Sequence, residues 1–181
     1  MSRAAIPLDA PTDDAFDAAM APLFEGAPHF LARLSAARPF VSLDELFDRA
    51  REIAHAMPEA EQLELIDAHP RLGAPPATVS AYSFVEQGYD LGTAPPVDPD
   101  AAPPDAAPSD LAAALTRAND AYEAHFGFRY CVFVAGRSRE ALLPDMTAAL
   151  RRDRDAEIHR ALDAVVDIAH DRAAGPAHGS R

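Results

Sequence analysis

The chain has 181 residues, of which 49% are hydrophobic and 25% are charged, a composition typical of globular rather than disordered proteins. The 29 acidic residues outnumber the 16 basic ones, and the formal net charge is −13. Nucleic acids and anionic membrane surfaces bind basic faces, so this charge argues against both as partners. A small anionic molecule is still a suitable ligand wherever a few cationic side chains converge.

The length favours one domain over residues 1–181, with a core from 10 to 175 and flexible ends at 1–9 and 175–181. The single cysteine, Cys131, lies in an apolar run and cannot form an intrachain disulfide. No apolar stretch approaches the roughly 20 residues of a membrane span, and the N-terminus lacks the apolar core of a signal peptide. We therefore expect a cytoplasmic protein.

Helical periodicity dominates the first third of the chain. Thr12 is placed to cap a helix with apolar residues at helical spacing, namely Phe16, Met20, Leu23 and Phe24. A short helix is expected over 30–34. Ser42 and Glu45 have the spacing of a capping box, in which hydroxyl and carboxylate each accept from the other residue's backbone N–H, and a long apolar stripe follows them.

Proline residues set the limits of the next helix. Pro58 suits its first turn, and the helix must end near His69 because Pro70 disfavours helical geometry in the residue before it. After a loop at 73–78, a short helix is expected over Ser83–Gln87. Residues 93–109 are Pro-rich and of low complexity, which predicts a solvated surface loop rather than a domain boundary.

Four further elements follow this loop. Ser109 or Asp110 is placed to cap a helix that ends at 125 or 126. The apolar run from Phe128 to Val134 does not alternate, so it is either a buried extended segment or a strand without an obvious partner. Ser138 is placed to cap another helix, and a last long helix follows 151–155. The predicted class is all-α, one compact multi-helix domain with a short extended segment near 128–135.

The last helix carries an arginine on its apolar stripe. The stripe runs through Ile158, Ala161, Leu162, Val165, Ile168 and Ala169, and its spacing continues to Arg172. Arginine is rarely buried unless it is paired. Arg172 therefore either bends its stem toward water at the helix end or meets an anion in a pocket.

A group of polar residues is the main candidate for chemistry. His69, Ser83, Glu86 and Gln87 fall within nineteen residues, where the apolar periodicity has broken off. Each has a structural alternative, because His69 suits a helix end and Ser83 with Glu86 has the spacing of a capping box. Metal binding is not expected, since the seven histidines show no His-x-x-x-His spacing and no second cysteine is present.

Several motifs together resemble a known family. They occur in the order Pro39-Phe40, His69-Pro70, Ser83-x-x-Glu86-Gln87, Tyr122, Phe126-Gly127-Phe128, Gly136-Arg137-Ser138 and Arg172. This order resembles that of 2-oxo-4-hydroxy-4-carboxy-5-ureidoimidazoline (OHCU) decarboxylases, which yield (S)-allantoin in urate degradation. The resemblance covers about residues 10–175. It implies a compact helical fold, a homodimer and a decarboxylase that uses no metal or organic cofactor on a small anionic ureido-imidazoline substrate.

The resemblance also implies roles for individual residues. The catalytic set would be His69 as the proton carrier, Glu86 as its acidic partner and Arg172 as the cation that meets the anionic substrate. The substrate-binding set would be Pro70, Ser83, Phe84, Val85, Glu86, Gln87, Tyr130, Cys131, Val132, Phe133 and Val134.

The sequence departs from the family pattern at three positions. Arg71 stands where Asp often follows His-Pro, Arg129 where Pro is common after Phe-Gly-Phe, and Ala135 where Arg frequently precedes Gly. Arg71 and Arg129 are expected beside the site. Two alternatives stay open: a paralogue that decarboxylates another ureido or imidazolone acid, and a helical interaction module without catalysis.

Overall fold

The computed structural model describes residue 8 and residues 12–89 and 110–175, so the predicted loop at 93–109 and most of both predicted flexible ends lie outside the described residues. Within the described residues there are eight α-helices, one short 3₁₀ helix and no strand. The all-α prediction is confirmed. The stretch 129–134 is neither helix nor strand, which excludes the strand that the sequence had left open.

The chain divides into two compact units, which are described separately. The first unit comprises Met1–His69, Cys131–Phe133 and Asp153–Arg181. The second comprises Pro70–Tyr130 and Val134–Arg152. The expectation of a single domain over 1–181 stays a prediction.

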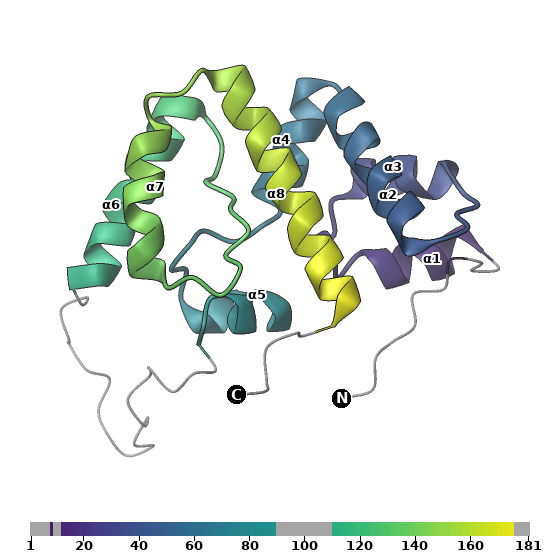
Figure 1. The fold of residues 1–181 in the computed structure, drawn as a ribbon, viewed down its shortest axis with the longest axis horizontal. Coiled ribbons are helices and arrows are strands. Elements are labelled where there is room, and N and C mark those ends of the chain that lie inside the picture. Colours follow the sequence, from purple (N-terminus) through teal and green to yellow (C-terminus); the bar gives the residue numbers. More distant parts are fainter. Residues whose placement is uncertain (1–7, 9–11, 90–109, 176–181) are drawn as a thin grey trace, which may run out of the picture. The chain divides into compact units, whose positions relative to one another are not determined.

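The first unit is a group of packed helices. Its helices are α1 (Asp13–Met20), α2 (Pro28–Ala36), α3 (Leu43–Ala56), α4 (Glu59–Asp67) and α8 (Arg154–Ala174). Both α3 and α4 pack against α8, and α2 packs against α1, α3 and α4 (Figure 1). The predicted apolar stripe of α8 is buried throughout, as its spacing requires. The helix α8 is therefore the central element of this unit.

Helix starts in the first unit follow the predicted caps. The Thr12 hydroxyl accepts a hydrogen bond from the Ala15 N–H, and the Ser42 hydroxyl accepts one from the Glu45 N–H. The Glu45 carboxylate accepts from the N–H of Val41, one residue before the expected Ser42. The cap of α3 is confirmed, and its carboxylate arm reaches one residue further than in the predicted capping box.

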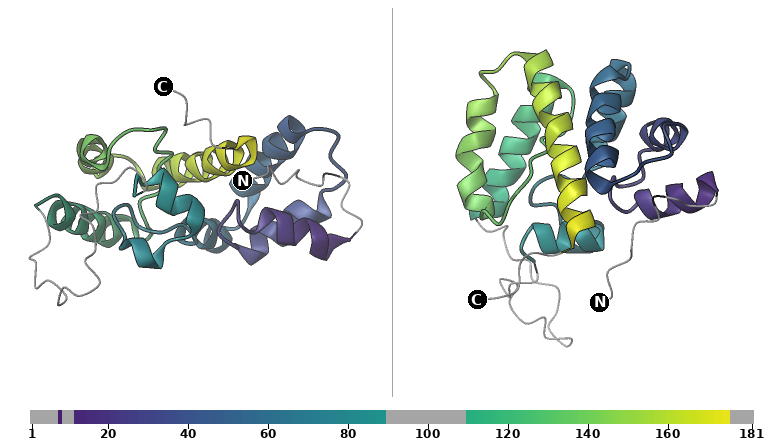
Figure 2. Two further views of the ribbon diagram at one scale, coloured as in Figure 1. Left: turned by 90° about the horizontal axis from the view of Figure 1, so that it is seen from below. Right: turned by 45° about the vertical axis from the view of Figure 1, so that its right-hand side comes forward.

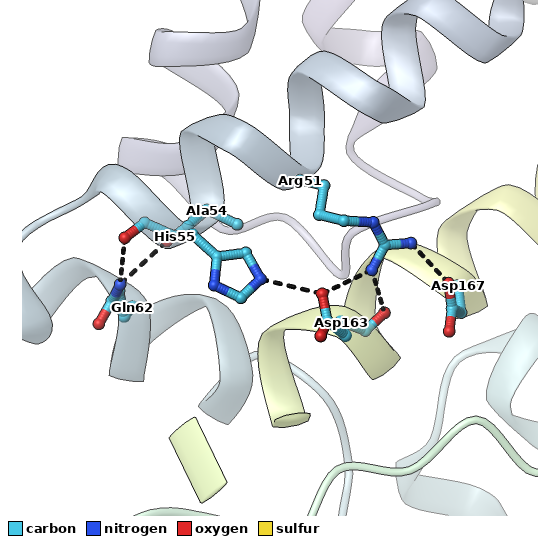
Figure 3. A network of polar contacts seen from close by, with 6 residues as sticks. All are labelled: Arg51, Ala54, His55, Gln62, Asp163 and Asp167. Atoms are coloured by element: carbon cyan, nitrogen blue, oxygen red, sulfur yellow. Dashed lines mark hydrogen bonds and ion pairs between the residues drawn. The ribbon is translucent and has the colours of Figure 1, made fainter. Parts of the chain in front are cut away.

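A half-exposed polar network joins α3 to α8 (Figure 3). Arg51 donates to Asp163 at 2.6 Å and to Asp167 at 2.7 Å, and His55 Nε2 lies 2.9 Å from the same Asp163 oxygen. At the C-terminal end of α3, the Gln62 amide donates to the carbonyls of Ala54 and His55, each at 3.1 Å (Figure 3). These bonds satisfy carbonyls that the end of a helix would otherwise leave without partners.

The second unit contains η1 (Pro76–Thr78), α5 (Ala81–Glu86), α6 (Asp110–Phe126) and α7 (Arg139–Ala149). The helices α6 and α7 pack side by side (Figure 2). Their core is aromatic, because the buried Tyr122 ring contacts the rings of Phe126, Phe128 and Tyr130 at centroid distances of 4.7, 5.7 and 5.1 Å. The predicted cap of α7 is confirmed, since the Ser138 hydroxyl accepts from the Ala141 N–H.

The helix α5 begins earlier than predicted. Its N-cap is Ser80, whose hydroxyl accepts from the Ser83 N–H, and Gln87 follows the last helical residue. The spacing Ser83-x-x-Glu86 predicted Ser83 as the cap, whereas the structure uses Ser80. Ser83 lies inside the helix and is buried, so the capping-box alternative for Ser83 and Glu86 is wrong.

Candidate active site

His69 lies just beyond the C-terminal end of α4, where Pro70 prevents the helix from continuing. The imidazole is buried, and its Nδ1 lies 3.4 Å from the carbonyl oxygen of Leu65. This contact favours the tautomer with the proton on Nδ1, which leaves the lone pair on Nε2. The position predicted from His-Pro is confirmed, and the ring belongs to the interior of the first unit.

Arg172 lies near the C-terminal end of α8 in the same unit. Its side chain is only 1% exposed, so the alternative in which the stem bends toward water is wrong. Nη1 donates to the carbonyl oxygens of Pro22 at 3.1 Å and Leu23 at 3.0 Å, and Nη2 donates to the Glu25 carboxylate at 2.9 Å. The guanidinium is thus held by the turn that follows α1.

Sequence reasoning missed Glu25. It lies in the turn after α1, 147 positions before Arg172, and its side chain is 13% exposed. No periodic pattern includes it, and its local signal in the sequence is the Glu-Gly pair of the turn that follows α1. The anion that meets Arg172 in this structure is therefore a carboxylate of the protein itself.

The surroundings of His69 lower its affinity for a proton. Burial lowers the pKa of His69 from 6.5 to about 4, and the positive charge of Arg172 adds to this effect. The Glu25 carboxylate and the Leu65 carbonyl act in the opposite direction and raise the pKa. His69 is therefore neutral at neutral pH, rather than partly protonated as its ordinary pKa of about 6.5 would suggest.

The predicted apolar segment is divided between the two units. Cys131 is buried, and Val132 and Phe133 are half-buried; all three belong to the first unit with His69 and Arg172. Tyr130, which is buried, and Val134, which is half-buried, belong to the second unit, as do Pro70 and Ser83–Gln87.

In the second unit, Gln87 holds the loop that follows Pro70. Its side-chain oxygen accepts from the Gly73 N–H at 2.7 Å, and its amide nitrogen donates to the Arg71 carbonyl at 3.3 Å. Asn119 of α6 donates to the Leu72 carbonyl at 3.0 Å, and the Tyr89 hydroxyl donates to the Ala74 carbonyl at 2.6 Å. Each residue from 71 to 74 therefore has a backbone group bonded to a side chain.

The remaining residues of the predicted Ser-x-x-Glu-Gln segment differ in exposure. Ser83 and Gln87 are buried, Phe84 and Glu86 are half-buried, and Val85 is 48% exposed. The Phe84 ring contacts the Tyr89 ring at a centroid distance of 5.4 Å. The inward face of α5 thus carries Ser83, and Gln87 is buried just after the helix, whereas Val85 faces solvent.

Of the departures from the family pattern, Arg71 has a local explanation. Arg71 makes a bidentate pair with Glu123, at 2.7 and 2.5 Å, and a further bond of 3.0 Å to Asp120 on α6. Its charge therefore serves the second unit's own structure. Ala135 has a φ of +50°, in the left-handed region that favours glycine.

Among residues 8, 12–89 and 110–175, no three His, Cys, Asp or Glu side chains are grouped so that they could hold a metal ion. In the same residues, no helix is long and apolar enough to span a lipid bilayer.

The described helices enclose a buried histidine beside an arginine–carboxylate pair. The protein thus belongs to the class of helical proteins with a polar site inside an apolar core. Comparison with known proteins identifies the family: the profile of the OHCU decarboxylase family matches residues 9–174. The chain therefore belongs to the OHCU decarboxylase family, whose members are decarboxylating lyases.

Individual relatives agree with this. A 2-oxo-4-hydroxy-4-carboxy-5-ureidoimidazoline decarboxylase from Haloferax volcanii is 26% identical over 162 residues, which cover 90% of this chain and 89% of the relative. The uric acid degradation bifunctional protein PucL from Bacillus subtilis is 27% identical over 152 residues, 84% of this chain but 28% of PucL.

Solved structures share the fold. A crystal structure of OHCU decarboxylase in the presence of (S)-allantoin matches with a TM-score of 0.65 and 20% identity, over 90% of this chain and 96% of the other. A crystal structure of (S)-allantoin synthase matches with a TM-score of 0.61 and 16% identity, over 92% of this chain and 51% of the other.

Proposed function

We propose that this protein decarboxylates OHCU to (S)-allantoin in urate degradation, and that it does so without a cofactor. Family membership supports the reaction. The observation that carries the proposal is the interior of the first unit, where a neutral imidazole lies near a buried arginine–carboxylate pair. A neutral base and a fixed cation are suited to an anionic substrate that must exchange a proton.

The chemistry needs little from the protein beyond orientation and proton transfer. When CO2 departs, the electron pair of the broken C–C bond stays on the conjugated imidazoline ring, and the ring takes up one proton in its place. A pocket that holds the carboxylate out of the ring plane aligns the breaking bond with this electron sink. Delivery of the proton to one face of the ring gives a single enantiomer.

His69 is the residue we assign to proton transfer. Because its pKa is about 4, the free enzyme presents a neutral imidazole with the lone pair on Nε2. It can therefore accept the proton of the substrate hydroxyl as CO2 departs and return that proton to the ring carbon afterwards. The nitrogen that received the electron pair of the broken C–C bond takes one further proton from solvent. A proton carrier of this kind works through a cycle that begins and ends with neutral His69.

Arg172 and the segment after Pro70 are assigned to binding. Arg172 supplies the positive charge for the substrate anion, and Glu86 is assigned as the acidic partner near the reacting centre. The remaining binding assignments are Pro70, Ser83, Phe84, Val85, Gln87 and residues 130–134. For Gln87, both ends of the side-chain amide bind the loop at 71–73, which supports a second task of holding that loop.

Assembly and location are proposed from the family resemblance. We propose a homodimer in the cytoplasm, with one domain over residues 1–181. Sedimentation velocity at several protein concentrations tests the dimer directly, and a purely monomeric species at micromolar concentration contradicts it.

The test of function follows chirality. Urate is converted enzymatically to OHCU, the protein is added, and circular dichroism records (S)-allantoin. The wild-type protein is expected to form (S)-allantoin faster than spontaneous decay, and His69→Ala is expected to lose activity by about 10²- to 10⁴-fold, the usual contribution of acid–base catalysis.

A matched control is His125→Ala, which removes an exposed histidine from α6 in the second unit. It is expected to retain wild-type activity. Near-normal turnover by His69→Ala contradicts the assignment of His69, and racemic allantoin at the spontaneous rate with wild-type protein contradicts the function.

A further inference from the structure

The turn that follows α1 places a carboxylate in the interior of the first unit. Glu25 has a φ of +53° and Gly26 a φ of +82°, so two successive residues occupy the left-handed region. Glycine adopts this region readily, whereas a residue with a Cβ does so at a conformational cost. A glutamate at position 25 therefore needs a reason, and its bond to Arg172 supplies one.

Arg172 is held from one side by three acceptors of this turn. The carbonyls of Pro22 and Leu23 take bonds from Nη1, while the Glu25 carboxylate takes a bond from Nη2 and brings the negative charge. A buried guanidinium without a counter-charge is strongly unfavourable, so Glu25 allows Arg172 to stay inside the core. The carboxylate and the two carbonyls together fix the plane of the guanidinium, because they bond two different nitrogens.

The groups acting on His69 come from three elements. Arg172 acts from α8, Glu25 from the turn after α1, and the Leu65 carbonyl from α4 itself. Arg172 and Glu25 have opposite charges and opposite effects on the proton affinity of His69. The charge of Glu25 thus partly cancels that of Arg172 at the imidazole.

We propose that Glu25 is a positioning residue for the decarboxylation: its carboxylate orients the Arg172 guanidinium and balances its charge next to His69. This proposal rests on the proposed function of the same site. It assigns to Glu25 two separable tasks, one of geometry and one of charge, and two substitutions distinguish them.

Glu25→Gln keeps the length of the side chain and an acceptor oxygen but removes the charge. Glu25→Asp keeps the charge but shortens the reach by one methylene. We expect Glu25→Gln to reduce kcat/KM by about 100-fold, the size of effect that a misplaced group produces, and Glu25→Asp to recover part of this loss. Glu52→Gln is the control, because Glu52 is an exposed carboxylate of the same unit whose partner is Arg49.

A structural role alone would lower the amount of folded enzyme without changing its pH dependence. In contrast, the fall of kcat/KM at acidic pH reports the pKa of the essential base in the free enzyme. Because the Glu25 charge raises the pKa of His69, its loss should move this acidic limb to lower pH. Glu25→Asp and Glu52→Gln should leave the limb near its wild-type position. An unchanged limb and unchanged kcat/KM in Glu25→Gln overturn the proposal.

Two measurements do not depend on turnover. The NMR signal of the His69 ring, titrated without substrate, should shift its midpoint below about 4 in Glu25→Gln, and an identical midpoint overturns the proposal. In a double-mutant cycle on the melting temperature, Glu25→Gln should cost far less in an Arg172→Gln background than alone. Equal losses in both backgrounds overturn it.

These outcomes separate the two hypotheses. If wild-type protein forms no (S)-allantoin while the NMR midpoint and the cycle behave as expected, the proposed reaction fails and the Glu25–Arg172–His69 arrangement stands. If the wild-type protein is active while Glu25→Gln matches it in every readout, the role of Glu25 fails and the reaction stands. If Glu25→Gln does not fold, Glu25→Asp and the double variant carry the same comparison.

Discussion

Two arginines link α8 of the first unit to other elements, in contrasting environments. Arg172, on α8 itself, is 1% exposed and bonded to Glu25 and two backbone carbonyls. Arg51, on α3, is 39% exposed and reaches across to Asp163 and Asp167, which are 45% and 47% exposed (Figure 3). The number of bonds is similar, but only the first arginine has given up its contact with water.

The difference lies in what each arginine does to its neighbours. Near Arg172, burial and positive charge hold the pKa of His69 at about 4. Near Arg51, burial opposes ionisation of Asp163, but hydrogen bonds from His55 and Arg51 outweigh it and lower the pKa of that carboxyl. Near Arg172 the shift keeps His69 neutral, whereas near Arg51 it keeps Asp163 charged, so the half-exposed cluster can join α3 to α8 through ion pairs.

The largest expected effect comes from breaking the buried pair. Arg172→Gln removes the positive charge that Glu25 binds, and we expect a loss of about 3 kcal/mol in the free energy of unfolding, as for other interrupted buried pairs. Urea denaturation monitored by circular dichroism measures it. A loss below about 1 kcal/mol would show that the pair is not effectively buried.

A decrease of similar size in the free energy of unfolding is expected when the pH is lowered. The pKa of His69 is about 4 in the folded protein and about 6.5 when unfolded, so the unfolded state binds a proton more readily. His69 therefore costs stability as pH falls from about 6.5 to about 4, by about 3 kcal/mol in total, and costs no more below that range. Urea unfolding at several pH values should show a shallower decline for His69→Ala than for wild type; parallel curves would contradict the lowered pKa.

A smaller effect is expected for the half-exposed arginine. Arg51→Gln removes two half-exposed ion pairs and should cost about 1 kcal/mol, because exposed pairs contribute little each. Urea denaturation measures this loss as for Arg172→Gln. Because both variants remove one positive charge, they differ in the exposure of the arginine and not in the change of net charge. If Arg51→Gln is as destabilising as Arg172→Gln, exposure does not explain the contrast.

The smallest effect concerns salt. Raising NaCl from about 0.1 to 1 M shortens the screening length from about 10 to 3 Å, which weakens half-exposed pairs more than buried ones. The stability difference between wild type and Arg51→Gln should shrink by a few tenths of a kcal/mol. The difference between wild type and Arg172→Gln should hardly change, and a comparable decrease in both would contradict the assigned burial.

Much of the fold followed from local signals, since Thr12, Ser42 and Ser138 cap the helices that their hydroxyls predicted. The choice of Ser80 over Ser83 was not predictable, because closely spaced hydroxyls offer equivalent caps and burial decides between them. The spacing of the serines in the sequence does not show which of them becomes buried.

For the site, the stripe of α8 predicted correctly that Arg172 points inward. Its partner Glu25 lies 147 positions away in a turn, and contacts at such separation leave no periodic trace in a single sequence. The neutral state of His69 was missed for the same reason, because a pKa depends on burial and on charges brought in by tertiary packing.

The loop at 71–74 is fastened in place without belonging to any helix. Gln87, Asn119 and Tyr89 occupy its backbone groups, and a Cβ at Gly73 would approach Leu115 Cδ1 to 2.8 Å. Its Gly73 amide should therefore exchange with deuterium as slowly as amides within the neighbouring helices. The fold should not tolerate insertions or deletions between Pro70 and Ala74, whereas the exposed residues 75–78 should tolerate changes in length.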